Sequence, residues 1–100
     1  MAINTTVTGK TVTLAVAGKI DEKAAEDLKA AFEELELASF EEVIFEFSDV
    51  SRIGSAGLGK MLLFYKKLAA LGCKMTVSNP PGHIRDLMVE LNLNTLFTIN

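Results

Sequence analysis

The chain has 100 residues, of which 49% are hydrophobic and 23% charged, and its net charge at pH 7 is −3. This length can bury one modest core, and no apolar run approaches the ~18 residues of a membrane span. A single cysteine and a single histidine exclude an internal disulfide and a Cys/His zinc cage, and the N-terminus lacks the pattern of a secretory signal. We therefore expect one cytoplasmic domain over residues 1–100, with no membrane insertion.

Two alternating, β-branched segments open the chain. Residues 3–7 and 11–16 are predicted to form an antiparallel hairpin that turns at Gly9 and Lys10. The next segment changes to helical periodicity, and Asp21 is suited to its N-cap position. The expected buried stripe of this helix consists of Ala24, Leu28, Ala31 and Leu35.

Strands and helices then alternate to the end of the chain. Gly72 is expected to be the C-cap of the second helix, because glycine is common at helix C-termini. The third helix carries apolar residues at helical spacing, namely Ile84, Leu87, Met88 and Leu91. The predicted elements are a strand at 42–47, a helix at 57–72, a strand at 73–78, a helix at 82–93 and a short strand at 95–99.

The order of elements, β-β-α-β-α-β-α-β, predicts an α/β fold with a mixed sheet, crossover helices and an antiparallel N-terminal strand. In such sheets the functional loops gather at the carboxyl ends of the strands. Residues 18–21 and 49–57 both connect a strand to a helix at such an end. We therefore expect Asp21 and Ser55 to be neighbours.

Charge is distributed unevenly along the chain. Nine of the thirteen acidic residues lie between Asp21 and Glu42, whereas none occurs from Val50 to Arg85. The cations of that second segment are Arg52, Lys60, Lys66, Lys67, Lys74 and Arg85. They predict a positive field around Ser55. The acidic overall balance and the scarcity of aromatic residues in this segment argue against nucleic-acid binding.

The stretch RIGSAGLGK, residues 52–60, holds one serine among small residues. Gly54, Ala56 and Gly57 leave the Ser55 hydroxyl unshielded at the start of a helix. A phosphate there would bring about −1.5 to −2 charges to a helix end that favours anions. The alternative is that Ser55 is simply the N-cap, and residue chemistry alone favours this second interpretation.

Enzymatic chemistry has little support in the sequence. The residues after Gly54 do not match the spacing of a phosphate-binding loop, and Ser55 directly follows a glycine, which breaks the nucleophile-elbow pattern. His83, the only histidine, is expected to be exposed in the first turn of a helix. The carboxylates of the acidic helix resemble an ordinary solvated face. We expect no catalytic residue, no metal and no cofactor.

The second helix offers a candidate partner surface. Its buried stripe is expected to contain Leu58, Met61, Leu62, Tyr65 and Ala69. Leu63 and Phe64 would then point outward beside Lys60 and Lys67, and exposed apolar residues near a functional loop can mark a binding surface. The alternative, that another element of the fold covers Leu63 and Phe64, stays open.

The segment FSDVSRIGSAGLGKMLLFYKKLAALGCKMTV resembles the STAS domain of bacterial anti-sigma-factor antagonists. Their signature, D-[LVS]-S-x-[IM]-D-S-[ST]-G-L-G, is matched by the run from Asp49 to Gly59. The family's upstream G-x-[LI]-D segment is matched by Gly18, Ile20 and Asp21. The downstream HIRDLMVELNLNTLFTI resembles the family's closing helix and strand. The resemblance thus covers nearly the whole chain.

This resemblance implies a partner-switching regulator that is not an enzyme. The unphosphorylated domain would bind an anti-sigma factor that is also a serine kinase. Phosphorylation of Ser55 would release it, and a metal-dependent serine phosphatase would restore binding. The expected partner-binding residues are Asp21, Arg52, Gly54, Ser55, Ala56, Gly57, Leu58, Lys60, Leu63 and Phe64.

The motif departs from the family pattern at two positions. Gly54 replaces the usual Asp, and Ala56 replaces the second hydroxyl residue. Two other functions therefore stay open. One is a non-phosphorylated accessory subunit of a bacterial lipid-transport ATPase complex, and the other is a small nucleotide-binding or nucleotide-hydrolysing domain. The missing phosphate-binding motif argues against the second of these.

Overall fold

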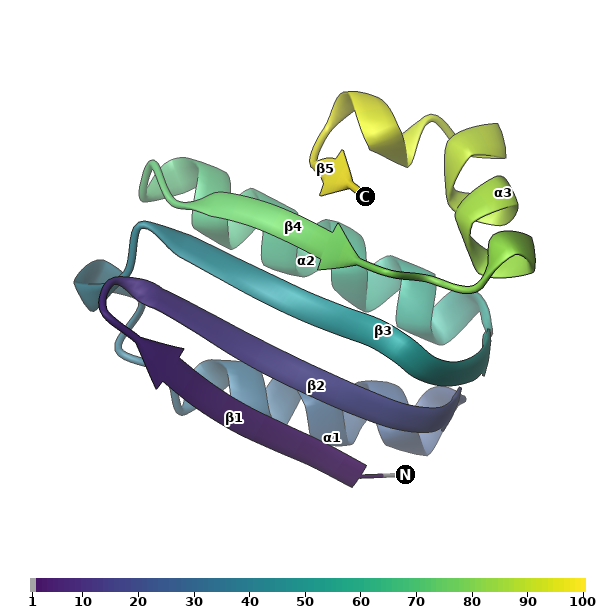
Figure 1. The fold of residues 1–100 in the computed structure, drawn as a ribbon, viewed down its shortest axis with the longest axis horizontal. Coiled ribbons are helices and arrows are strands. Elements are labelled where there is room, and N and C mark those ends of the chain that lie inside the picture. The colour runs from purple at the N-terminus through teal and green to yellow at the C-terminus, as the bar shows by residue number, and fades with distance from the viewer. Residues whose placement is uncertain (1) are drawn as a thin grey trace.

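The computed structural model describes residues 2–100, which form a five-stranded mixed sheet and three α-helices (Figure 1). The strands lie in sequence order, and β1 runs antiparallel to β2 while all other neighbours are parallel. The predicted α/β class and its antiparallel N-terminal strand are confirmed. The elements are β1 (Ala2–Thr8), β2 (Thr11–Ile20), α1 (Glu22–Glu33), η1 (Leu37–Ser39), β3 (Glu42–Ile53), α2 (Ser55–Ala70), β4 (Lys74–Ser78), α3 (Gly82–Glu90), η2 (Leu93–Thr95) and β5 (Thr98–Ile99).

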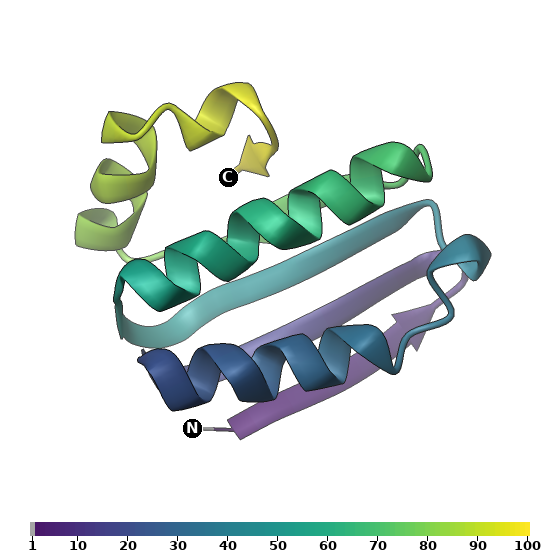
Figure 2. The same cartoon turned by 180° about the vertical axis from the view of Figure 1, so that it is seen from behind.

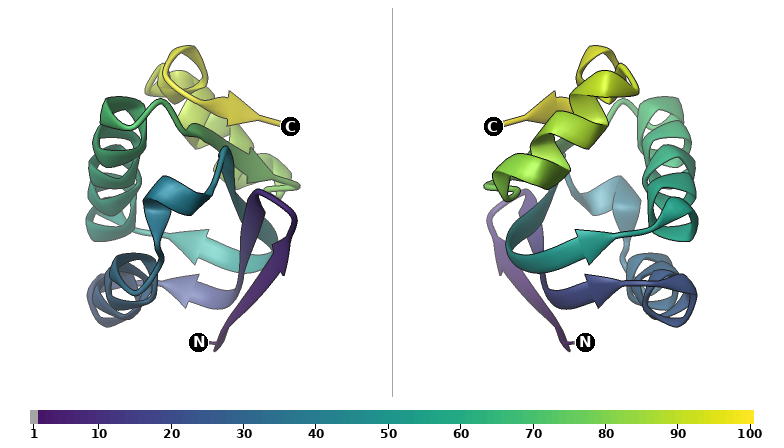
Figure 3. Two further views of the ribbon diagram at one scale, coloured as in Figure 1. Left: turned by 90° about the vertical axis from the view of Figure 1, so that its left-hand side faces the viewer. Right: turned by 90° about the vertical axis from the view of Figure 1, so that its right-hand side faces the viewer.

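Helices α1 and α2 lie side by side on one face of the sheet (Figures 2 and 3). Helix α3 lies beyond the carboxyl end of β4 (Figure 1). The core fills the space between these two helices and the sheet. Its centre is an aromatic stack, in which the Phe64 ring lies 4.4 Å from that of Phe32 and 5.3 Å from that of Phe45. One aromatic residue from each of α1, β3 and α2 therefore joins the two layers.

Strands β2 and β3 are longer than the sequence predicted. Their pairing contains two register shifts, one between Ala15 and Ala17 and one between Gly18 and Lys19. At these β-bulges β3 carries the extra residues, so its end bends and its in-out alternation is lost. The alternation on which the prediction relied stops at the first bulge, although the pairing continues as far as Ile20 and Ile53.

The predicted buried stripe of α1 is partly wrong. Ala24 and Leu28 are buried as expected, but Ala31 and Leu35 are only half-buried. Phe32 takes the next core position, four residues after Leu28, and its ring joins the aromatic stack. The helix ends at Glu33, before Leu35 is reached.

The predicted orientation of α2 is wrong. Its buried residues are Gly57, Met61, Phe64 and Leu68, so only Met61 of the expected stripe is buried. Leu62 and Ala69 are exposed, and Leu58 and Tyr65 are half-buried. Leucine occurs on several sides of this helix, so hydrophobic periodicity alone does not select a face. The aromatic stack decides the orientation.

The C-cap of α2 is Leu71, so the prediction of Gly72 at this position is wrong by one residue. The backbone of Gly72 is left-handed, with φ of 68°. The Cys73 N–H donates to the Leu68 carbonyl at 2.9 Å, and the Gly72 N–H donates to the Ala69 carbonyl at 3.1 Å. These two bonds form a Schellman motif, whose left-handed residue is usually glycine.

The C-terminal segment contains less strand than predicted. Helix α3 buries Ile84 and Met88, whereas Leu91 lies beyond its end and is exposed. Most of the stretch predicted as a strand at 95–99 forms the end of η2 and a bend, and only Thr98 and Ile99 pair with β4. Phe97 is buried although it lies outside a strand. The prediction attributed its hydrophobic character to a strand.

Candidate functional site

Two strand-to-helix loops meet at the carboxyl ends of β2 and β3. Ile20 pairs with Ile53, and the Gly54 N–H donates to the Ile20 carbonyl at 3.0 Å. Asp21 directly follows one of these paired residues, and Ser55 lies two positions beyond the other. The prediction that the two loops share one edge of the sheet is therefore confirmed.

Ser55 is the first helical residue of α2 and is exposed. The N-cap is Gly54, which is extended with φ of −95° and ψ of 179°. Its carbonyl accepts the first helical hydrogen bond, from the Leu58 N–H at 3.0 Å. The interpretation of Ser55 as an N-cap is therefore wrong. Its side chain does not cap the helix and stands at the position where the helix dipole favours negative charge.

Gly54 and Gly57 differ in how much space the structure leaves for a side chain. A Cβ at Gly54 would meet only the Ile20 carbonyl oxygen, at 3.8 Å, so a larger side chain fits. A Cβ at Gly57 would lie 2.7 Å from both Ile20 Cγ2 and Ile53 Cγ1. Gly57 therefore allows α2 to approach the ends of β2 and β3, which holds Ser55 against the edge of the sheet.

We expect Gly57→Ala and Gly59→Ala to change stability in opposite directions. Overpacking at Gly57 costs about 1–3 kcal/mol, which outweighs the ~1 kcal/mol that alanine contributes to helix propensity. Gly59 has nothing within 4 Å of its Cβ position, so alanine there should stabilise the protein by about 0.5–1 kcal/mol. Urea denaturation of both variants measures this difference, and stabilisation by Gly57→Ala would contradict the close packing.

Asp21 is the N-cap of α1, as predicted. Its side chain accepts a hydrogen bond from the Ala24 N–H at 2.9 Å, and Lys19 Nζ lies 3.8 Å from its other oxygen. The Ala24 hydrogen bond is the main cause that lowers the pKa of Asp21, and the charge of Lys19 acts in the same direction. The carboxylate is exposed beside the Ser55 loop, so it can cap its own helix and still face a partner.

We expect Asp21→Ala to lower the denaturation midpoint and Asp21→Asn to lower it less, because Asn keeps the capping acceptor. The folded pKa of Asp21 is depressed. Its stabilising contribution is therefore complete above the unfolded-state pKa of about 3.9 and is lost as the pH falls through the folded value. The midpoint difference between wild type and Asp21→Asn should shrink in this acidic range. A difference that persists there would contradict the role of the charge.

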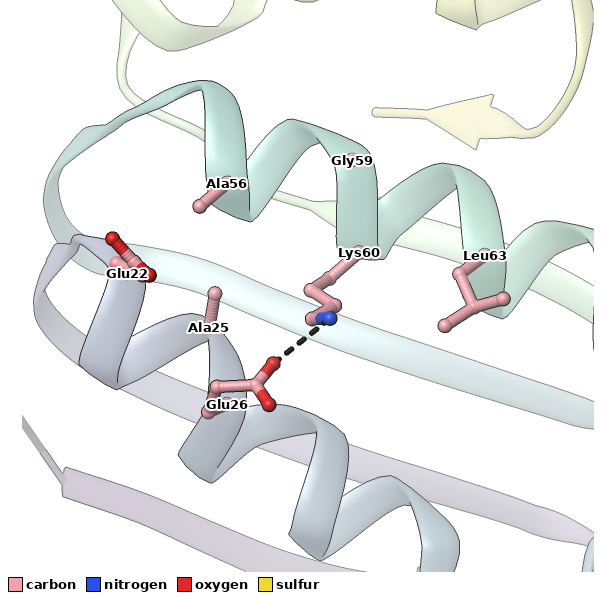
Figure 4. Close-up of a pocket in the computed structure, with 7 residues that line it drawn as sticks. All are labelled: Glu22, Ala25, Glu26, Ala56, Gly59, Lys60 and Leu63. Carbon is pink, nitrogen blue, oxygen red and sulfur yellow. Dashed lines mark ion pairs between the residues drawn. The ribbon is translucent and has the colours of Figure 1, made fainter.

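An open groove of ≈ 370 Å³ runs between α1 and α2 beside Ser55 (Figure 4). It is lined by Glu22, Ala25, Glu26, Ala56, Gly59, Lys60 and Leu63. Small residues on both helices leave this space, and Leu63 lines it at the end away from Ala56. Lys60 Nζ lies 2.8 Å from a Glu26 carboxylate oxygen, an ion pair that spans the groove. This hydrogen bond and the Lys60 charge lower the pKa of Glu26.

The structure brings most of the predicted partner-binding residues to this one region. Ala56, Lys60 and Leu63 line the groove. Asp21, Gly54 and Ser55 are exposed where the adjoining helices begin. Arg52 is exposed near the end of β3, where it pairs with Lys19 in the sheet register. Gly57 is buried, and Leu58 is half-buried.

The expectation that Phe64 is exposed is wrong. Its side chain has no exposed surface and stacks between the sheet and α1. Leu63, the other residue expected to be exposed, is half-buried at the groove. The alternative that another element covers these side chains therefore holds for Phe64.

Sequence reasoning missed the contribution of α1 to this groove. Glu22, Ala25 and Glu26 line it, yet the acidic residues of this helix indicated only a solvated face. Their spacing places them on one side of the helix, but the periodicity of the helix alone does not show that this side borders α2. Asp21 and Ser55 were predicted to lie at the same edge of the sheet, and α1 and α2 must therefore begin side by side. This prediction could have indicated which residues of α1 border α2.

The positive field predicted around Ser55 is reduced by this helix pairing. Lys60 pairs with Glu26, and Lys67 lies 3.9 Å from a Glu33 oxygen. Acidic and basic segments that are separate along the sequence therefore meet at the interface of α1 and α2. The surface beside Ser55 has mixed charge.

His83 is exposed in the first turn of α3, as predicted. Its Nε2 lies 2.9 Å from the Ser51 carbonyl oxygen, which ties α3 to the end of β3. Among residues 2–100, no group of three or more His, Cys, Asp or Glu side chains could hold a metal ion. No helix in this described part of the chain is long and apolar enough to cross a membrane.

Comparison with known proteins adds a family and several similar structures. The STAS domain family matches residues 2–100. The phosphorylated form of SpoIIAA, a Bacillus cell fate determinant, has a TM-score of 0.78 at 22% identity, covering 99% of this chain and 91% of that one. An anti-sigma factor antagonist from Mycobacterium paratuberculosis has a TM-score of 0.86 at 22% identity, covering 98% and 83%.

The STAS domain of a SulP transporter from Vibrio cholerae also matches, with a TM-score of 0.74 at 14% identity, covering 95% of this chain and 77% of that one. A search of curated proteins found no match. The solved structures share the fold of this chain with sequences that have diverged widely.

Proposed function

The chain belongs to the STAS domain family, and from that premise we propose that it is an anti-sigma factor antagonist controlled by phosphorylation of Ser55. In its unphosphorylated form it binds an anti-sigma factor that is also a serine kinase. Phosphorylation releases it, and a metal-dependent serine phosphatase reverses the change. It acts as a binding protein in the cytoplasm and catalyses no reaction itself.

The observation that carries this proposal is the position of Ser55. The residue is exposed at the first position of α2, and the N-cap before it is a glycine without a side chain. A kinase can approach the hydroxyl because its neighbours in sequence, Gly54 and Ala56, are small. Solved relatives include SpoIIAA in its phosphorylated form, which shares this fold.

The groove between α1 and α2 supplies the partner surface in this proposal. It adjoins Ser55 and combines small apolar residues with the Lys60–Glu26 ion pair. A bound partner would cover Ser55 together with the groove. A phosphate of about −1.5 to −2 charges on Ser55 would then lose its contact with water, and this desolvation cost would weaken the complex.

A second candidate is a constitutive STAS subunit of a bacterial lipid-transport ATPase complex. Gly54 favours it, because the carboxylate that usually precedes the serine in antagonists is absent. The backbone around Gly54 has room for a side chain, so steric constraint does not explain the glycine. In this alternative the same surface binds a transporter subunit and Ser55 stays unmodified.

Kinase labelling separates the two candidates. The purified protein is incubated with ATP and each anti-sigma serine kinase of its own genome. We expect stoichiometric labelling of wild type, none of Ser55→Ala, and full labelling of Ser51→Ala, which removes another exposed serine at the end of β3. Equal labelling of Ser55→Ala and wild type would reject Ser55. The absence of labelling with every kinase would favour the transporter subunit.

A further inference from the structure

Strand β1 forms an unprotected edge of the sheet (Figure 1). Within residues 2–100 it pairs only with β2, so the backbone groups on its other side have no strand partner. All of its residues except Ile3 are exposed. Edge strands in proteins usually carry a charge, a proline or a bulge that blocks further pairing. The sequence AINTTVT has neither charge nor proline, and its register with β2 is regular throughout.

We propose that β1 pairs antiparallel with β1 of a second copy of this chain, which joins the two sheets into one. A two-fold axis at Thr5 gives a register in which Ile3 of each copy faces Val7 of the other. Both residues lie on the same face of the sheet, because they pair with Val16 and Val12 of β2. Val7, which is 57% exposed in a single copy, then has an apolar neighbour across the new pair.

The remaining pairs in this register are equally compatible. Asn4 faces Thr6, and Ala2 faces Thr8, so polar and small residues meet on the other face. Thr5 faces its own copy on the axis. A strand that matches itself in this way favours a two-fold symmetric, isologous contact over a contact with an unrelated protein.

Charge does not oppose this contact at β1 itself. The chain carries a net charge of −3, which repels another copy over most of the surface, whereas β1 is uncharged. Two strands of seven residues bury less than the roughly 1,200 Å² of a stable interface. The dimer is therefore weak and reversible.

In this dimer the candidate functional site of each copy stays accessible. The axis is perpendicular to the sheet, so α1 and α2 of the two copies lie on the same face. Because the paired strands run in opposite directions, the two Ser55 loops lie at opposite ends of the joined sheet. The dimer would therefore present two partner surfaces at once.

Sedimentation velocity across the micromolar range tests this pairing. We expect wild type to shift from monomer to dimer as its concentration rises. Thr5→Lys and Thr5→Glu each place like charges opposite one another at the axis, so each variant alone should stay monomeric. An equimolar mixture of the two should dimerise again, because Lys then faces Glu. Thr5 is exposed, so circular dichroism should show both variants folded.

The matched controls are Asn94→Lys and Asn94→Glu, which change the charge equally at an exposed residue of η2. Both should dimerise like wild type. Three outcomes overturn the proposal: a wild type that is monomeric throughout the range, a dimer that persists in Thr5→Lys or Thr5→Glu alone, and a mixture that fails to dimerise. None of these outcomes bears on the phosphorylation of Ser55.

Discussion

Replacement of Phe64 by alanine is expected to destabilise the protein by about 3–5 kcal/mol. The side chain has no exposed surface, and its ring contacts those of Phe32 and Phe45 at the centre of the core. Removing it leaves a cavity between α2 and the sheet that these neighbours cannot fill. This loss is a large part of the ~5–15 kcal/mol by which a folded domain is usually stable. Urea denaturation measures the change in the free energy of unfolding.

Leu63→Ala is the matched control on the same helix. Leu63 is half-buried at the groove, so its truncation should cost at most about 1 kcal/mol of stability. The proposed partner surface includes Leu63, so partner affinity should fall in this variant although the fold remains intact. Similar losses of stability at both positions would contradict the orientation of α2.

Introduction of a negative charge at Ser55 is expected to have the largest effect on binding. We predict that Ser55→Glu weakens the complex with the anti-sigma factor at least about 100-fold, or about 2.8 kcal/mol. Burying a carboxylate without a compensating partner costs several kcal/mol. The helix itself should tolerate the change, because acidic residues in the first turn interact favourably with the helix dipole.

Ser55→Gln is the neutral control for size. It should bind the partner much more tightly than Ser55→Glu, and titration calorimetry with the purified anti-sigma factor compares the two. Equal affinities would mean that charge at this position does not control the complex. Unfolding curves of both variants show whether a loss of affinity arises from the interface or from the fold.

Much of the fold could be predicted from the sequence because its signals are local. Alternating β-branched residues predicted the hairpin, Asp21 predicted the start of α1, and Gly72 predicted the end of α2. These signals depend on a few neighbouring residues and on hydrogen bonds within one turn. The extension of β3 beyond Phe47 could not be predicted, because β-bulges interrupt the alternation that defines a strand.

The candidate site was predicted only in part, since it depends on contacts between distant elements. The shared edge of Asp21 and Ser55 followed from the parallel topology. The orientation of α2 did not, because Phe64 is buried by a stack with rings from α1 and β3. The groove walls supplied by α1 also depend on this helix packing. Periodicity within one segment contains no information about either contact.

The most direct test of phosphorylation at Ser55 is the mass of the protein isolated from its native host, before and after phosphatase treatment, with the modified peptide sequenced. We expect part of the protein to be heavier by one phosphate, located on Ser55, and the phosphorylated proportion to change between growth and stress. A uniformly unmodified protein under both conditions would contradict control by phosphorylation.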